Sequence, residues 1–248
     1  MSSGAAHAFG RPRSLFAAIA FASVASACGG PQSTLDPAGP AAAAIAATWW
    51  WMFGGALLVW ALVLGLLLRA LLRGENTRAL PRPQRLIVAG GLVLPTVVLA
   101  ALLVYGSVHS QRITGSDSAV DLVVAVDARQ WQWTFRYLDD AGIAQATTVD
   151  ALVLPRGRMV EFEVRSADVI HSFWIPRLGG KIDAIPGRVN RLRLRADRAG
   201  AIRGQCAEFC GLEHARMGFD VHVLEPEAWE AWLRALPPDG SDRGGARP

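Results

Sequence analysis

Two cysteines, a histidine and a methionine lie within twelve residues in the last fifth of the sequence. They are Cys206, Cys210, His214 and Met217, and a second histidine, His171, lies upstream of them. Thiolate, imidazole and thioether groups are soft or borderline ligands, the set that selects copper over hard cations. The pattern Cys-x₃-Cys-x₃-His-x₂-Met, with His171 reaching it from another strand end, therefore predicts a copper site.

Each residue of this pattern also has a simpler interpretation. Cys206 and Cys210 are close enough in sequence to form a disulfide in an oxidising compartment, Met217 alone is typical of a core, and His214 alone is typical of a surface. A structural zinc site is disfavoured because methionine is a poor zinc ligand. A mononuclear blue-copper site needs one cysteine, so the second thiolate favours two metals.

The elements that must position these residues show a period of two. From about residue 119, apolar residues alternate with polar ones over residues 122–126, 159–164, 189–194 and 217–223. Turn signals at Pro155-Arg-Gly157 and Pro186-Gly187 separate these runs, and an amphipathic helix is predicted only over residues 225–236. Many short strands with Gly/Pro turns predict an antiparallel β-sandwich or a small barrel.

Two long apolar runs precede this domain, over residues 45–68 and 86–108, and each is long enough to span a bilayer as a helix. The loop at residues 69–85 carries five arginines and one acid, Glu75, which places it in the cytoplasm and both flanking ends outside. Three tryptophans at residues 49–51 mark the outer end of the first span. Pro95 predicts a kink in the second span.

The first 27 residues are typical of a signal peptide. Arg11 and Arg13 precede a run of small and apolar residues that is too short to span a membrane and that ends at Cys28. The stretch before Cys28 resembles a bacterial lipobox, although Ala25 stands where a large aliphatic residue is usual. We expect Cys28 to be the lipidated first residue of the mature chain, the alternative being a signal peptide cut near an incidental cysteine.

The basic charge of the chain belongs to its membrane part. The first 108 residues hold seven arginines and two acids, whereas the remainder holds eighteen basic and nineteen acidic residues. This distribution gives no argument for nucleic-acid binding. The sequence also contains no phosphate-binding glycine loop and no Cys-x-x-Cys-His motif, so no covalently attached haem is predicted.

From Cys28 onward the chain resembles the subunit II family of cytochrome c oxidases. The segment from Cys206 to Met217 resembles the family's copper A loop, and Gln130-Trp-Gln-Trp133, Phe173-Trp-Ile-Pro176 and Asp183-Ala-Ile-Pro-Gly-Arg188 resemble further family motifs. The resemblance implies a cupredoxin-like antiparallel β-sandwich on a two-helix transmembrane hairpin in a bacterial inner membrane. We therefore expect a signal peptide (1–27), an outer loop (28–44), a hairpin (45–109), a copper A domain (110–236) and a disordered tail (237–248).

The resemblance also implies the roles of particular residues. Cys206 and Cys210 would bridge two coppers, His171 and His214 would bind one copper each, and Met217 and the backbone carbonyl of Glu208 would complete the set. The Glu208 side chain would bind a magnesium ion shared with subunit I, and Trp131 would be the point where electrons arrive from cytochrome c. The complex would be a proton-translocating oxidoreductase that passes these electrons to the haem of subunit I, where oxygen is reduced to water.

The sequence departs from the family pattern at two places, and it leaves several rival functions open. Ala128 replaces a glycine that is common before the Gln-Trp pair, and no acid lies near the cytoplasmic start of the second span, where many relatives carry a glutamate that feeds protons to subunit I. The rivals are a quinol-oxidase subunit, a nitrogen-oxide reductase with copper A, and a copper-binding assembly lipoprotein. Candidate acids for docking cytochrome c are Asp139, Asp140, Glu225 and Glu227, the first two because they follow Trp131 by eight and nine residues.

Overall fold

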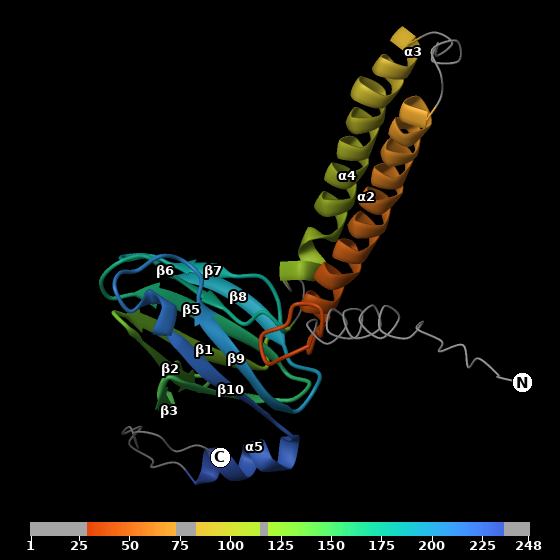
Figure 1. Ribbon diagram of the computed structural model, residues 1–248. Helices are drawn as coiled ribbons and strands as arrows, with labels where there is room; N and C mark the ends of the chain where they lie inside the picture. The colour runs from red at the N-terminus through yellow and green to blue at the C-terminus, as the bar shows by residue number, and fades with distance from the viewer. Residues whose placement is uncertain (1–28, 73–82, 115–118, 236–248) are drawn as a thin grey trace, which may run out of the picture.

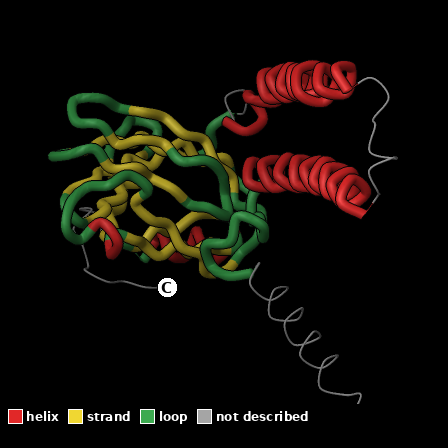
Figure 2. Tube along the Cα trace, turned by 45° about the horizontal axis from the view of Figure 1, so that its top comes forward, coloured by secondary structure: helices red, strands yellow, loops and turns green. Residues whose placement is uncertain are grey.

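A helical hairpin and a separate β-domain make up the protein in the computed structural model, which describes residues 29–72, 83–114 and 119–235 (Figure 1). The hairpin consists of α2 (Pro40–Leu72) and of a second helix built from α3 (Pro83–Val88), a π-helical segment (Ala89–Val93) and α4 (Leu94–Thr114). Figures 1 and 2 show the two helices side by side, with the β-domain at one end of the pair.

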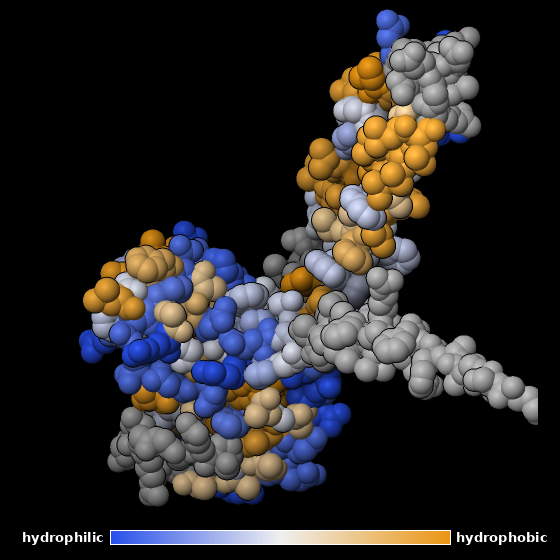
Figure 3. Space-filling model, in the orientation of Figure 1, coloured by the Kyte–Doolittle hydropathy of each residue, from blue (hydrophilic) through white to orange (hydrophobic). Residues whose placement is uncertain are grey.

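The two helices are apolar around their whole circumference, and Figure 3 shows this as a hydrophobic column above a mostly hydrophilic β-domain. By length and composition, Pro40–Leu72 and Gln84–Val108 are each able to cross a membrane, and their apolar side chains are not buried by the rest of the chain. Helices of this kind need an apolar environment. Both predicted spans are therefore confirmed as helices, although α2 begins five residues earlier and ends four residues later than predicted.

The irregular part of the second helix lies directly before Pro95. A proline ring clashes with the carbonyl four residues earlier, here that of Gly91, and removes one helical hydrogen bond. The backbone accommodates this with the π-helical segment, which contains Gly91. A π-helical segment thus lies directly before Pro95, and the kink expected there stays a prediction.

The β-domain is a sandwich of two five-stranded sheets (Figure 2). The first, sheet A, has the order β3-β2-β1-β5-β8, and the second, sheet B, has the order β4-β10-β9-β6-β7. The strands are β1 (Leu122–Arg129), β2 (Gln132–Leu138), β3 (Ala144–Val149), β4 (Ala151–Pro155), β5 (Met159–Ser166), β6 (His171–Trp174), β7 (Ile182–Ala184), β8 (Asn190–Arg195), β9 (Gly200–Cys206) and β10 (Gly218–Leu224). A final helix, α5 (Pro226–Arg234), contacts β10 and β4.

The predicted sandwich is confirmed, with one correction to its strand pairing. Six pairs of neighbouring strands are antiparallel, but β1 pairs with β5 and β4 pairs with β10 in parallel. Parallel neighbours need a crossover rather than a tight turn, and the chain makes one by passing from one sheet to the other between the paired strands. The result is a mixed, cupredoxin-like sandwich, in which the four predicted strands are β1, β5, β8 and β10.

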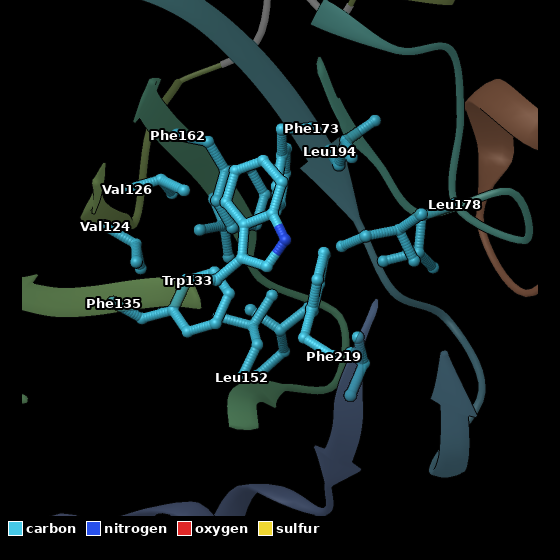
Figure 4. Close-up of a cluster of buried hydrophobic side chains, with 14 of the residues drawn as sticks. Val124, Val126, Trp133, Phe135, Leu152, Phe162, Phe173, Leu178, Leu194 and Phe219 are labelled. Atoms are coloured by element: carbon cyan, nitrogen blue, oxygen red, sulfur yellow. The ribbon is translucent and has the colours of Figure 1, made fainter. Parts of the chain in front are cut away.

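Aromatic rings fill the space between the sheets near one end of the sandwich (Figure 4). Phe219 stacks on Phe173 with 5.3 Å between ring centroids, and it also meets Trp133 at 5.6 Å and Phe135 at 5.2 Å. All four side chains are fully or almost fully buried. Rings of this size dominate the apolar area that the domain buries, so this cluster is a closely packed and rigid part of the core.

The segment at residues 29–39, here called the N-terminal strap, ties the β-domain to α2. The Ala38 amide donates to the Arg177 carbonyl at 2.7 Å, and the Asp197 amide donates to the Ala38 carbonyl at 2.8 Å. Asp36 pairs with Arg177 at 2.6 Å and with Arg198 at 2.7 Å. The strap is therefore bound to the β-domain along its backbone and through its one acidic side chain.

Candidate metal centre

All five predicted ligand side chains lie at the same end of sheet B. His171 is the first residue of β6, and Cys206 is the last residue of β9, which pairs antiparallel with β6. Cys210 and His214 lie in the loop after β9, with His214 opening a 3₁₀ turn (His214–Arg216), and Met217 directly precedes β10. The loop is closed at its base, because the Cys206 amide donates to the Met217 carbonyl at 2.9 Å.

The donor atoms of these side chains are within contact of one another. The two cysteine sulfurs are 3.8 Å apart, His171 Nδ1 lies 3.9 Å from Cys206 Sγ, and the ligand atoms of His171, Cys206 and Cys210 form a group within 4.8 Å. On the other side of the pair, Cys210 Sγ lies 3.6 Å from His214 Nδ1 and 3.6 Å from Met217 Sδ. The cysteines form no disulfide, so two thiols, two imidazoles and a thioether form one continuous cluster.

The β-domain shields most of the site from water. His171, Cys206, Cys210 and Met217 are buried, whereas His214 is partly exposed. Burial, together with the neighbouring Cys206, raises the pKa of the Cys210 thiol to about 12. A metal that binds here must displace this proton. Buried soft donors without a hard oxygen-rich shell fit copper and do not fit calcium or magnesium.

The backbone of Glu208 takes part in the site, but its side chain does not. The Glu208 carbonyl oxygen lies 3.2 Å from Cys206 Sγ, so it reaches the sulfur cluster. The Glu208 side chain is exposed, and its carboxylate lies 3.8 Å from Lys181 Nζ. The backbone carbonyl of Glu208 therefore faces the sulfur cluster, whereas its side-chain carboxylate faces the surface near Lys181.

A hydrogen-bond network behind His171 was not assigned from the sequence. The Asp168 carboxylate lies 2.9 Å from His171 Nε2 and accepts a hydrogen bond from the Gln130 amide at 2.7 Å. Burial raises the pKa of Asp168, but the hydrogen bonds from Gln130 and His171 outweigh it and hold that pKa below its ordinary value. A carboxylate that orients a ligand imidazole is a common partner of metal sites. An acid three residues before the histidine was the only sequence signal for it.

Trp131 lies against the same loop. Its indole Nε1 donates to the Cys210 carbonyl at 3.2 Å, and the Gln130 side chain donates to the same oxygen at 2.8 Å. Gly211, with φ of +119°, faces both residues, and a Cβ there would lie 3.0 Å from Gln130 Nε2. A glycine is therefore required for the close approach of the loop to Trp131.

Residues 138–224 match the sequence profile described as the periplasmic domain of cytochrome c oxidase subunit II. Cytochrome c oxidase subunit 2 of Alkalihalophilus pseudofirmus is 40% identical over 113 residues, which are 46% of this chain and 32% of that protein. Cytochrome c oxidase subunit 2 of Branchiostoma floridae is 34% identical over 157 residues, which are 55% of this chain and 68% of that protein. This chain belongs to the cytochrome c oxidase subunit II family.

A solved structure of the periplasmic domain of the Bradyrhizobium japonicum oxidase subunit II is also similar. It shares 29% identity and a TM-score of 0.46, and the match covers 50% of this chain and 99% of that one. Membership of the subunit II family, together with two helices that are long and apolar enough to cross a membrane, makes the chain a membrane-anchored protein. The chain spans about a third of the A. pseudofirmus relative, 32% of its length.

The candidate docking acids of this subunit II are not beside Trp131. Trp131 precedes β2, whereas Asp139 and Asp140 follow it, so the length of the strand, about 25 Å, separates them. Glu225 and Glu227 follow β10, whose other end adjoins Met217. The expectation that nearness in sequence places Asp139 and Asp140 next to Trp131 is wrong, because an extended strand carries the chain to the opposite end of the sandwich.

Some predicted features lie outside the described residues. These are the signal peptide, Cys28, most of the loop between the two spans with Glu75, and the tail at residues 237–248. Their assignments stay predictions.

Proposed function

We propose that this chain is the electron-accepting subunit of an oxidase, which takes electrons from cytochrome c at a dinuclear copper A centre and passes them to the haem of subunit I. The observation that carries the proposal is the continuous, mostly buried cluster of two thiols, two imidazoles and a thioether. A single copper does not need the second thiolate, whereas two coppers can share both. Oxygen chemistry is left to subunit I.

The geometry supports a division of the ligands between two metals. Cys206 and Cys210 lie in the middle of the cluster and would contact both coppers, with His171 on the Cys206 side and His214 on the Cys210 side. Met217 lies next to Cys210, and the Glu208 carbonyl lies next to Cys206. When bound, such a copper pair accepts and releases one electron at a time.

The surrounding residues limit how far the ligands move when the charge of the site changes. Asp168 orients His171, and Trp133 meets the His171 ring edge-on at 6.2 Å between centroids. Trp133 is itself buried within the aromatic cluster. Ligands held in this way undergo little rearrangement, which favours fast electron transfer.

Trp131 provides a short path from the surface to the site. Its indole is partly exposed and is hydrogen-bonded to the carbonyl of Cys210, one of the two bridging thiol residues. An electron that arrives at the indole face has one hydrogen bond to cross before it reaches a ligand residue. We therefore retain Trp131 as the point where electrons enter.

We further propose that the Glu208 carboxylate binds a magnesium ion at the contact with subunit I. Exposed carboxylate oxygens are the ligands that magnesium prefers, and the usual magnesium site combines few carboxylates with other partners. The Lys181 ammonium near Glu208 also pairs with Asp183 at 3.0 Å, and this pairing raises the pKa of Lys181. Lys181 is thus held partly by another acid, which leaves Glu208 able to bind a cation.

The proposed orientation places the β-domain outside a bacterial inner membrane, as expected from the arginine-rich loop between the spans. Cys28 would carry a lipid at the start of the mature chain. Mass spectrometry of the N-terminal peptide tests the proposed lipidation of Cys28. Residues preceding Cys28, or an unmodified thiol, would contradict it. Domain boundaries are proposed as given above from the sequence, with the hairpin beginning at Pro40 instead of residue 45.

Electron paramagnetic resonance of the copper-loaded, purified chain tests the central proposal. We expect two coppers per chain and a mixed-valence signal in which one unpaired electron is shared between them. The Cys210→Ser variant should lose the shared signal, whereas Cys28→Ser should keep it. One copper per chain with an ordinary mononuclear signal would favour a copper-storage or assembly protein instead.

A further inference from the structure

The surface around Trp131 has an apolar centre. Trp131 is 36% exposed, and Phe209 and Leu212 of the adjoining loop are 77% and 93% exposed. Val169 and Ile170, which follow Asp168, are also exposed, and Asp168 is hydrogen-bonded to the residue before Trp131. We call these five apolar residues, Trp131, Val169, Ile170, Phe209 and Leu212, the apolar patch. Figure 3 shows hydrophobic side chains gathered at the end of the β-domain away from the helices, and patches of this kind mark interaction sites.

Arginines dominate the sheet surface that borders the patch. Sheet A turns six arginines and three acids outward from strands β1, β2, β5 and β8, and the strand register places Arg193, Arg195 and Glu161 toward the end away from Trp131. The residues are Arg129, Arg136, Arg165, Arg191, Arg193, Arg195, Asp127, Glu161 and Glu163. The described helices make their main contacts with this sheet at β8, so most of its outer face is uncovered.

Every acid on this face is already paired. Asp127 binds both Arg136 and Arg165, Glu161 binds Arg193 at 2.6 Å and Arg191 at 3.3 Å, and Glu163 binds Arg191 at 2.8 Å. Arg129 lies two residues before Trp131, is exposed and forms no ion pair within the described part of the chain. The field next to the patch is therefore positive.

The acids at the patch itself do not reverse this sign. Asp168 hydrogen-bonds to the His171 ring and adds one negative charge, fewer than the net positive charge of sheet A. Glu213 pairs with Arg216 at 3.1 Å, and Glu208 lies near Lys181. Acidic residues in the turn after β2 and at the start of α5 lie at the opposite end of the sandwich. A donor that brings a ring of lysines to Trp131 would therefore meet arginine beside an apolar surface, and like charges disfavour such docking.

We infer that the electron donor of this subunit docks on the apolar patch with an acidic face, so that carboxylates around the exposed edge of its haem meet Arg129 and its neighbours on sheet A, Arg136 and Arg165. This inference rests on the proposed function, because it names the partner of the same site. The apolar contact holds the complex, and the opposite charges steer the encounter.

The test measures the oxidation of two c-type cytochromes, one acidic and one basic, by the intact oxidase complex as ionic strength rises. A small uncharged reductant, tetramethyl-p-phenylenediamine, serves as a donor that needs no docking. The variants are Arg129→Glu and the milder Arg129→Gln, with Arg234→Glu as the matched control. Arg234 is also exposed and forms no ion pair among the described residues, but it lies at the end of α5.

We expect the acidic cytochrome to be oxidised fastest at low salt and more slowly as the Debye length falls below about 10 Å. Arg129→Glu should slow it about threefold to tenfold, Arg129→Gln should slow it less, and Arg234→Glu should leave it unchanged. Turnover with the small reductant should be the same in all variants.

Two results would overturn the inference while the proposed function stands. One is a basic cytochrome that is the faster donor at low salt and becomes faster still in Arg129→Glu. The other is an oxidation rate that is independent of salt and of Arg129 for both cytochromes, with the small reductant still oxidised. Failure of the unmodified complex to oxidise the small reductant at all would instead overturn the proposed function, and this inference with it.

Discussion

Replacing Gly204 by alanine should destabilise the β-domain more than a single added methyl group suggests. Gly204 on β9 pairs with Phe219 on β10, and a Cβ at position 204 would lie 2.0 Å from Phe219 Cζ. Ordinary contacts begin at 3.4 Å, so the ring must move by more than about 1 Å. Phe219 is 1% exposed and is enclosed by Phe173, Trp133 and Phe135, so its ring cannot shift without displacing theirs.

Overpacking of a well-filled core costs about 1–3 kcal/mol, and we place this substitution at the upper end because a whole ring must shift. For a domain of this size, that cost corresponds to a fall of the melting temperature by about 10 °C. The backbone at Gly204 does not need a positive φ, so the loss cannot come from backbone strain. Alanine also makes the unfolded chain more rigid than glycine does, and this gain would offset less than about 1 kcal/mol of the loss in stability.

The measurement is thermal unfolding of the purified full-length chain in detergent, followed by circular dichroism. Gly218→Ala is the matched control, because it lies on the adjoining strand and its Cβ would meet only Arg203 Nη2 at 3.3 Å and the Gly204 carbonyl oxygen at 3.4 Å. The control should melt within about 3 °C of the wild type. If Gly204→Ala melts with the control, the aromatic cluster can accommodate the extra methyl group and the reasoning about its rigidity fails.

Three further predictions follow from the site and the strap. Asp168→Asn removes the charged partner of His171 and should weaken copper retention about 10-fold to 100-fold in a chelator competition, and unchanged retention would contradict its orienting role. Met217→Leu should cost less than about 1.5 kcal/mol in unfolding but alter the copper absorption spectrum and slow electron flow, so an unchanged spectrum and turnover would exclude Met217 as a ligand. Arg198 and Arg177 hold the pKa of Asp36 below its ordinary value of 3.8, so the charged form stabilises the fold above that pH and the gain is lost as the pH falls through the lowered pKa. Asp36→Asn should accordingly lower the melting temperature by a few degrees at pH 7, and this difference should shrink as the pH falls below 3.8. A difference that does not change between pH 7 and acid pH would show that the ion pairs are not its cause.

The sequence was most informative where one physical pattern dominates. The two apolar spans and strands β1, β5, β8 and β10 follow directly from their hydropathy. Strand β6 does not alternate, because three of its four residues are buried, so the pattern that predicts strands was absent at the element that carries His171. The grouping of the five candidate ligand side chains could be predicted, because soft donors gathered at this spacing suit few purposes besides binding copper.

Spatial relations between distant segments could not be predicted in the same way. No local pattern indicates that β1 pairs in parallel with β5, yet this pairing brings the start of the β5–β6 loop beside Gln130. The role of Asp168 depends on that juxtaposition. The predicted positions of Asp139 and Asp140 were wrong for the opposite reason: residues that are close in sequence can be a full strand apart in space.

The attachment of α2 to the β-domain has a consequence for the distance that an electron must travel. Gly39 lies so close to the Arg195 carbonyl that a Cβ would be 2.2 Å from its oxygen, and the Ala42 amide donates to the Leu178 carbonyl at 3.1 Å. The first turn of the spanning helix is thus fixed to the copper-bearing domain, with no free hinge between them. Tunnelling rates fall steeply with distance, so a carrier on a loose tether spends much of its time too far from its acceptor. Under the proposed function, a domain fixed to its own membrane helix would hold its metal site at a steadier distance from an acceptor in the same membrane than a tethered domain would.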